Sequence, residues 1–401
     1  MNTLRTVTKA LRPGRDASRR RKTLGVKYTR GLLDALFGQE MHAARVESLA
    51  NGVVGVLAAA VLSIHAIGQA YALLAGIKGK SGIKQIDRLL SNAGVDVRAL
   101  QRRWVEFVVG ARKEIVVVLD WTEFDGDDHS TLCAYLVTRH GRATPLVWQT
   151  VQKSELAGKR TETEHALIER LHDWLDPEIE VELLADRGFG DQKLYEMLMV
   201  LGWDFTIRFR GLIRVENAEG QARPAHDWVL ASGRAFLLRN AKVTDDRMEI
   251  PAVVVVHAKG MKEPWCLATS RKELSASQVV KRYGRRFTIE ETFRDTKDLH
   301  FGMGLKATHI GKPDRRDRML LLVAMAHALL TLLGAASEAT GMDAYLKANT
   351  VKRRTHSLFR QGSYWYQAIP NMREDWLRTL MNAFDRIVRE HAVFREAFGI
   401  L

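Results

Sequence analysis

Cysteine is scarce in this sequence. Cys133 and Cys266 are the only two among 401 residues, and neither belongs to a Cys-x-x-Cys pattern. This excludes a disulfide framework and a structural zinc site, and it predicts reduced thiols in a cytosol-like compartment. No apolar h-region follows the basic N-terminus, so we expect no secretory signal. The sequence also lacks internal repeats and low-complexity segments.

Long apolar runs are few. Residues 53–76 are long enough to span a bilayer but carry polar side chains such as His65, and residues 319–334 are shorter and contain His327. These features favour buried helices of a soluble protein over membrane spans, and we expect no membrane partner.

Positive charge is abundant. The chain has 61 Lys and Arg against 47 Asp and Glu, which gives a net charge of +14. Such a balance indicates a polyanionic partner, nucleic acid ahead of an anionic membrane. Residues 1–31 hold ten Lys or Arg and one acid, Asp16. Two interpretations stay open for this segment: a solvated, partly disordered tail, or an arm that orders on DNA.

Residues 28–108 have a helical pattern, and we expect a basic helical DNA-binding domain over residues 1–110. A Gly/Ser/Lys-rich turn at 79–82 joins short helices there. Four basic side chains around this turn could contact phosphates or belong to an ordinary solvated face: Lys78, Lys80, Lys84 and Arg88.

The hydrophobic period changes at residue 114. Residues 115–119 form an apolar, β-branched run that ends at Asp120, and residues 181–185 form a second run that ends at Asp186. Such runs are typical of buried strands. The other predicted elements here are strands at 131–139, 143–151 and 204–210 and helices at 161–175 and 191–201.

This βββαβαβ order predicts a ribonuclease-H-like core within a mixed fold class, α+β or α/β. The first and fourth strands would be parallel neighbours, so Asp120 and Asp186 would project side by side at their C-terminal ends. We assign the catalytic domain to residues 111–300. Strands predicted at 235–243, 248–257 and 265–269 suggest a β subdomain inserted at about 211–274, and residues 301–401 form a C-terminal helical region.

Residues 281–297 contain no proline and a single glycine, and Ser275 and Ser277 are plausible N-caps, so we expect one helix. At 100° per residue, four functional side chains share one narrow stripe of that helix. They are Tyr283, Arg286, Glu290 and Lys297. Glu291 and Asp295 lie off the stripe.

Asp120, Asp186 and Glu290 are three carboxylates that suit Mg²⁺ or Mn²⁺, and two such ions could activate water on a phosphodiester. Singly, a strand-terminal Asp is more often a loop cap or an ion-pair partner. The order and spacing of all three make the combination much stronger.

Three motifs carry a family resemblance: Asp120 in Val-Leu-Asp-Trp-Thr, Asp186 in Ala-Asp-Arg-Gly-Phe-Gly-Asp, and Tyr-x-x-Arg-x-x-x-Glu-x-x-x-x-x-x-Lys from Tyr283 to Lys297. Together they resemble the bacterial insertion-sequence DDE transposases with a YREK motif. The resemblance covers most of the chain, because a β insertion before the glutamate is also a family feature. It implies a catalytic triad of Asp120, Asp186 and Glu290 that binds two Mg²⁺ or Mn²⁺ ions.

The resemblance also implies DNA contacts. Tyr283, Arg286 and Lys297 would hold transposon-end phosphates beside the scissile bond. Trp265 and Phe287 would hold a flipped base by stacking, although a core position in a strand is an equally good interpretation of Trp265. Arg208 would contact DNA near the site or form a surface ion pair.

The implied reaction is nicking at transposon ends, hairpin formation, and joining of the freed 3′-OH to target DNA. Homodimers would hold two ends, with helix Asp375–Phe398 as a candidate contact surface, and the setting would be the bacterial cytoplasm at the nucleoid. Two alternatives remain: a related nuclease that does not join DNA, and a catalytically inactive DNA-binding inhibitor.

Overall fold

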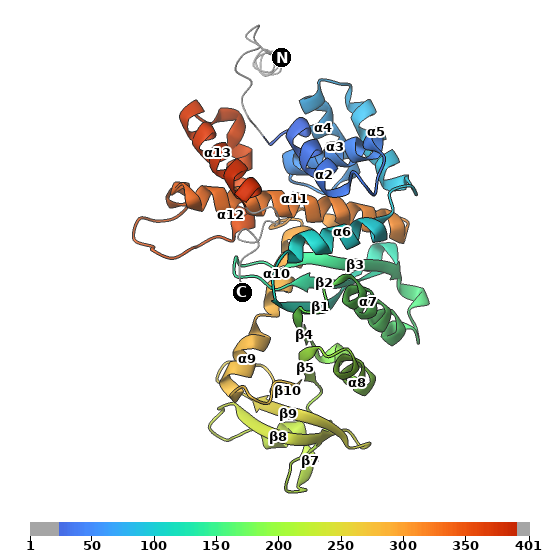
Figure 1. Cartoon of the computed structure of the whole chain (residues 1–401), viewed down its shortest axis with the longest axis vertical. Coiled ribbons are helices and arrows are strands. Elements are labelled where there is room, and N and C mark those ends of the chain that lie inside the picture. Colours follow the sequence, from blue (N-terminus) through green and yellow to red (C-terminus); the bar gives the residue numbers. More distant parts are fainter. Residues whose placement is uncertain (1–23, 391–401) are drawn as a thin grey trace.

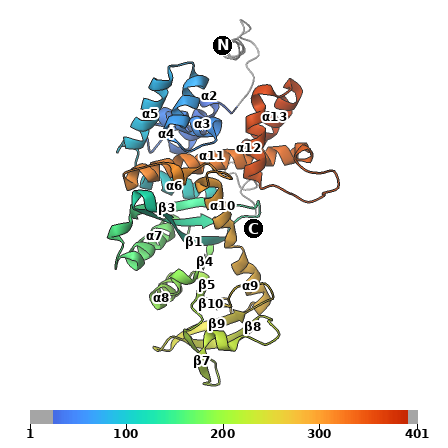
Figure 2. The same cartoon turned by 180° about the vertical axis from the view of Figure 1, so that it is seen from behind.

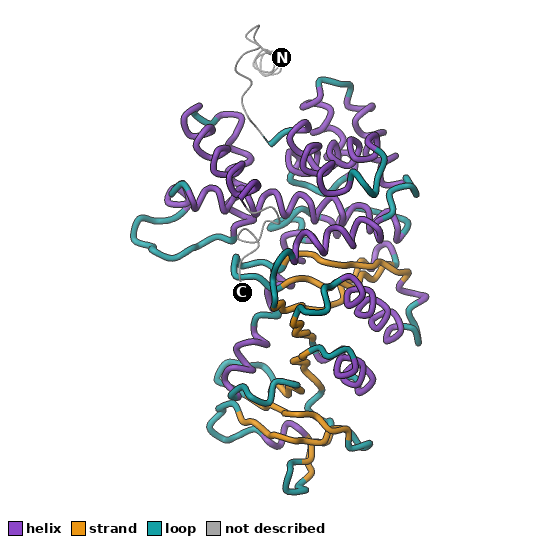
Figure 3. The backbone as a smooth tube through the Cα atoms, viewed as in Figure 1, coloured by secondary structure: helices purple, strands orange, loops and turns teal. Residues whose placement is uncertain are grey.

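Helices and one long sheet occupy different parts of the molecule in the computed structural model, which describes residues 24–390 (Figure 1). Most helices gather at one end, and the strands run from the middle to the other end (Figure 3). The helices are α2 Val26–Phe37, α3 Ala43–Ala59, α4 Ile64–Ala75, α5 Gly79–Ser91, α6 Val97–Val109, α7 Arg160–Trp174, α8 Gln192–Val200, α9 Ala276–Gly284, α10 Phe287–Lys297, α11 Pro313–Ala339, α12 Leu358–Ala368 and α13 Glu374–Glu390. The strands are β1 Glu114–Phe124, β2 His129–Leu136, β3 Thr144–Gln152, β4 Glu180–Ala185, β5 Asp204–Phe209, β6 Arg214–Glu216, β7 Ala222–Pro224, β8 Phe236–Val243, β9 Met248–Val256 and β10 Trp265–Thr269.

The sheet has ten strands in the order β3-β2-β1-β4-β5-β10-β9-β8-β6-β7. Strand β4 pairs in parallel with both β1 and β5, and the other pairs are antiparallel. The predicted parallel pairing of the first and fourth strands is therefore confirmed. The continuous apolar run of β1 is buried, as a central strand with both faces covered requires.

The prediction that the first strand ends at Asp120 is wrong. Strand β1 continues to Phe124, because residues Trp121–Phe124 pair with the start of β2. The pairing of β1 with β4, however, ends at Leu119 opposite Ala185. Asp120 and Asp186 are thus the first residues beyond the last parallel pair on two adjacent strands.

The predicted β insertion is not a separate sheet. Strand β10 pairs antiparallel with β5, with Cys266 opposite Phe209, so the inserted strands extend the central sheet. The three predicted strands of this region are confirmed as β8, β9 and β10 to within one residue at each end. The short strands β6 and β7 were not predicted.

The prediction of one helix over residues 281–297 is also wrong. Helix α9 ends at Gly284 and α10 begins at Phe287. Between them the N–H groups of Arg285 and Arg286 donate to the carbonyls of Arg282 and Tyr283, so this turn has i→i−3 bonds. Glycine is a weak helix former, and Gly284 marks the break. Helix α9 packs beside β9 and β5, whereas α10 packs beside β1 (Figure 2).

Helix α11 crosses the molecule between the sheet on one side and helices α2–α5 and α13 on the other (Figures 1 and 2). It is long and apolar enough to cross a membrane, and 94% of its most apolar 18-residue window is buried inside the protein. The predicted buried helix is therefore confirmed. Helices α3, α12 and α13 pack against it. Gly334 and Gly362 leave no room for a Cβ where α11 and α12 approach.

The other apolar stretch, residues 53–76, is divided between α3 and α4, which meet at an angle of 100°. The predicted C-terminal helix corresponds to α13, and its residues 391–398 lie outside the described part of the chain, as do residues 1–23 of the basic N-terminal segment.

Candidate active site

Asp120 and Asp186 lie at the same edge of the sheet. The side chain of Asp120 is 16% exposed, and its Oδ1 accepts the N–H of Trp121 at 2.9 Å. Asp186 caps a short 3-10 turn, Arg187–Phe189, and its Oδ1 accepts the N–H of Gly188 at 2.7 Å. Both carboxylates thus follow adjacent parallel strands, and each is oriented by a hydrogen bond from a backbone N–H close to it in the sequence.

Arg286 joins Asp120 to the third carboxylate, Glu290. Its Nη1 donates to Oδ2 of Asp120 at 3.0 Å, and its Nη2 donates to Oε1 of Glu290 at 2.5 Å. The Arg286 side chain is 7% exposed, whereas that of Glu290 is 50% exposed. One buried guanidinium therefore compensates two carboxylates, one of them open to solvent.

Burial raises the pKa of the Asp120 carboxyl to about 6. The positive charge of Arg286 opposes this rise, while the nearby charges of Asp186 and Glu290 add to it. Negative charges that disfavour the ionised form of Asp120 also favour the uptake of a cation beside it. The charges of the other two predicted residues therefore act on Asp120.

The donor set suits a divalent cation, because carboxylate oxygens are the ligands that Mg²⁺ and Mn²⁺ prefer. Within residues 24–390, however, no three His, Cys, Asp or Glu side chains converge closely enough to hold a metal ion. The guanidinium of Arg286 lies between two of the three carboxylates. The chemistry of the residues fits the metal, and Arg286 would have to leave Asp120 and Glu290 for an ion to bind there.

An open groove of about 470 Å³ passes over Asp120, Glu290 and Lys297. The Nζ of Lys297 donates to Oγ1 of Thr122 at 2.7 Å and to the carbonyl of Glu123 at 2.9 Å. Burial lowers the pKa of the Lys297 amino group, and nearby Lys306 lowers it further. Lys297 thus ties α10 to β1 and lines the groove with its positive charge.

Three aromatic rings meet beside Arg286. Trp265, the first residue of β10, packs edge-on against Tyr283 at 5.1 Å between ring centroids and lies 5.8 Å from Phe287. Tyr283 is 1% exposed, and burial raises its pKa to about 12. Phe287 is 40% exposed and lies 5.1 Å from the Arg286 guanidinium. Tyr283 is thus the buried member of this aromatic cluster, and it does not line the groove with Lys297.

Arg208, at the end of β5, has a protein partner. Its Nη2 lies 2.8 Å from Oε1 of Glu263 and donates to the carbonyl of Pro264 at 3.2 Å. Arg187 binds the same carboxylate. Glu263 thus holds both Arg208 and Arg187. Arg187 follows Asp186 in the sequence, so this pair of arginines lies at the edge of the site.

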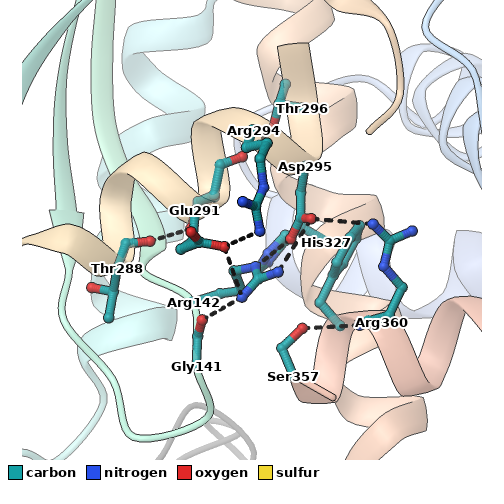
Figure 4. Close-up of polar contacts among 12 residues, drawn as sticks. Gly141, Arg142, Thr288, Glu291, Arg294, Asp295, Thr296, His327, Ser357 and Arg360 are labelled. Atoms are coloured by element: carbon teal, nitrogen blue, oxygen red, sulfur yellow. Dashed lines mark hydrogen bonds and ion pairs between the residues drawn. The ribbon is translucent and has the colours of Figure 1, made fainter. Parts of the chain in front are cut away.

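Sequence reasoning missed the contacts that anchor the far side of α10. Asp295 is 1% exposed there, and its carboxylate binds Nε and Nη2 of Arg142 from the turn between β2 and β3. Arg360 of α12 lies 3.5 Å from the same carboxylate (Figure 4). Arg142 and Asp295 are 153 residues apart, so no local pattern could have paired them.

Glu164 was also missed. Its Oε1 accepts the indole N–H of Trp121 at 2.6 Å, one residue beyond Asp120. Arg160 lies 3.5 Å from this carboxylate and 4.7 Å from the Trp121 ring. Burial raises the pKa of Glu164 to about 7. The only sequence signal for it was its place on an amphipathic helix.

The chain matches the family described as the transposase DDE domain over residues 111–329, more than half of its length. It therefore belongs to that family, whose members act as nucleases and transposases on DNA and generally use divalent metal ions. A comparison with curated proteins found no match. The matched region includes the three carboxylates, Arg286, and most of α11.

Proposed function

We propose that this protein is a DNA transposase that cleaves the ends of a mobile element and joins them to target DNA through a hairpin intermediate. Two observations support the proposal: Asp120 and Asp186 follow the last parallel pair of the adjacent strands β1 and β4, and Arg286 bridges Asp120 to Glu290 of α10. The family match supports the chemical class.

In this proposal Asp120, Asp186 and Glu290 hold two Mg²⁺ or Mn²⁺ ions. When bound, the ions would activate the attacking oxygen and stabilise the leaving oxygen of a phosphodiester. Asp120 and Asp186 are fixed by adjacent strands and backbone donors, so they supply the rigid part of the site. Glu290 is half-exposed and joins them from α10. The catalytic core is proposed to be ribonuclease-H-like, between an N-terminal domain at 1–110 and a C-terminal region at 301–401.

Arg286 and Lys297 would bind the phosphates that flank the scissile bond. Arg286 is engaged by two carboxylates in this structure, and a DNA phosphate would offer it a third partner. Movement of Arg286 toward that phosphate would free Asp120 and Glu290 for metal. Tyr283 would act through its packing against Trp265, because its side chain is buried here.

The hairpin step needs an extruded base, and Trp265 with Phe287 offers a stacking surface beside Arg286. Stacking of one base on an aromatic side chain is worth about 1–3 kcal/mol. A homodimer would hold two transposon ends, with α13 as a candidate contact surface. The bacterial cytoplasm, at the nucleoid, would be the site of action.

The decisive experiment uses labelled linear DNA that carries the element's own ends, with Mg²⁺, and compares wild type with Glu290→Gln. The matched control is Glu291→Gln, which removes the neighbouring carboxylate that pairs with Arg294 on another side of α10. We expect a 3′ nick that matures to a hairpin in wild type and the control, and loss of both in Glu290→Gln while DNA binding persists.

Other outcomes reject the proposal. Tight end-binding without cleavage by wild type would indicate an inactive DNA-binding inhibitor. Cleavage without joining to a second DNA would indicate a nuclease. Equal activity of wild type and Glu290→Gln would remove Glu290 from the triad.

A further inference from the structure

Three arginines gather behind the junction of α9 and α10. Arg139 belongs to the turn between β2 and β3, Arg282 to α9, and Arg285 to the turn that joins the two helices. Burial lowers the pKa of the Arg285 guanidinium, the positive charges of Arg282 and Arg139 lower it further, and the negative charge of Glu182 opposes this fall. We call these three residues the rear arginine cluster.

Within the described residues, Glu182 is the one carboxylate that forms an ion pair with this cluster. Arg282 contacts Glu182 through Nε at 2.6 Å and Nη2 at 2.5 Å, and Glu182 is 3% exposed and also accepts from Thr206 at 3.0 Å. That carboxylate is therefore fully engaged. Within the described residues 24–390, Nη2 of Arg285 is buried without a hydrogen-bond partner. No ion pair of Arg139 is found within the same residues, and its side chain is exposed.

Such an arrangement is costly without a ligand. A buried donor without an acceptor loses its hydrogen bonds to water, and like charges in a partly desolvated place repel. An anion with two adjacent oxygens would satisfy the free donors and offset the charge. A phosphodiester has these properties, and the planar guanidinium fork matches its geometry.

The rear arginine cluster lies on the side of α10 away from the active-site groove. The turn that carries Arg139 packs against α10 through Ala143, whose N–H and carbonyl bond to the hydroxyl of Thr292. In a helix, Thr292 projects opposite to Glu290, two residues before it. Helix α10, about 10 Å across with its side chains, therefore separates the cluster from the groove.

We propose that the rear arginine cluster binds a backbone phosphate of DNA other than the scissile one. The exposed Arg139 donates to the phosphate oxygens, and Arg285 joins it when its side chain turns so that the buried Nη2 faces the phosphate. Arg282 stays on Glu182 and adds its charge. The contact positions DNA without reading its sequence. This inference rests on the proposed function, because it takes DNA as the polyanion.

The test measures binding of a linear duplex that carries the element's ends, without divalent metal, by fluorescence anisotropy over a range of salt concentrations. The test protein is the double variant Arg139→Gln/Arg285→Gln. The control is Arg102→Gln/Arg373→Gln, which removes the same net charge from two surface arginines that already have carboxylate partners. Affinity of the test variant should fall, and the slope of log K against log salt should become shallower by about 1, the value for one lost phosphate contact. The control should keep the wild-type slope.

A wild-type slope in the test variant, with wild-type binding and end cleavage intact, would overturn the rear site alone. Absence of DNA binding by wild type would instead overturn the proposed function. If the double variant does not fold, the single variant Arg139→Gln decides, because its side chain is exposed. It should weaken binding in the same direction, and unchanged affinity and slope would reject the proposal.

Discussion

Carboxylate and guanidinium groups form ion pairs on both sides of α10, but the ratio of the two groups is reversed between the sides. On the side of α10 away from the groove, which we call the rear side, one buried carboxylate, Asp295, faces the two guanidinium groups of Arg142 and Arg360. On the groove side one guanidinium, that of Arg286, faces two carboxylates, Asp120 and Glu290. A carboxylate that is fully compensated and excluded from water acts as an anchor. Carboxylates that share one cation and remain partly exposed can accept another cation.

The largest expected effect is on the rear side. Asp295→Asn keeps the shape of the side chain but leaves Arg142 without its buried partner. Breaking such a pair from one side costs about 3–5 kcal/mol. We expect a clear loss of stability in denaturant unfolding followed by fluorescence. The control is Asp375→Asn, in an exposed pair with Arg373, which should leave the unfolding midpoint nearly unchanged. Equal midpoints for the two variants would show that Asp295 is not an anchor.

The next effect concerns the groove side. Arg286→Gln removes the cation that competes for Asp120 and Glu290, so Mn²⁺ should bind the DNA-free variant at least about tenfold more tightly, or about 1.4 kcal/mol. Isothermal titration calorimetry above pH 7, where Asp120 is ionised, measures this directly. Arg294→Gln is the matched control, because its partner is Glu291. Unchanged Mn²⁺ affinity in Arg286→Gln would mean that Arg286 does not compete with metal.

The last comparison concerns Glu164, whose carboxylate lies 3.5 Å from one half-exposed arginine, Arg160, and is neither fully compensated nor open to the groove. Its folded pKa of about 7 is above the ordinary value of 4.5, so the folded state binds more protons in that window. Stability is therefore highest below about pH 4.5 for this group and falls as pH rises toward 7, by at most about 1.4 kcal/mol per pH unit.

Glu164→Gln should make this part of the pH profile flatter while keeping an acceptor for Trp121. Unfolding midpoints between pH 5 and pH 8 provide the measurement. Glu162→Gln, exposed on the same helix, should keep the wild-type slope. A Glu164→Gln profile that superimposes on the wild-type profile would contradict the prediction.

The sequence predicted the parts of the fold that depend on local pattern. The apolar runs before Asp120 and Asp186 placed β1 and β4, because strand period and burial are visible over six residues. The end of β1 was misplaced, since its last four residues pair only with β2. The break after Gly284 was missed because a single glycine does not end every helix.

The site was predictable as a set of residue types but not as a set of contacts. The spacing from Arg286 to Glu290 is one helical turn, so their contact could be foreseen. The bridge from Arg286 to Asp120 spans 166 residues, and that from Arg142 to Asp295 spans 153. Such pairs arise from tertiary packing, which no local pattern encodes.

The pairing of β10 with β5 has a mechanical consequence. Trp265 begins β10, Asp186 follows β4, and β5 lies between these strands. Two strand spacings, roughly 10 Å in all, separate β4 from β10. Because these strands are joined by backbone hydrogen bonds, Trp265 keeps a nearly constant distance from Asp120 and Asp186. In the proposed function, a DNA base stacked on Trp265 would therefore stay at a fixed distance from the carboxylates of Asp120 and Asp186.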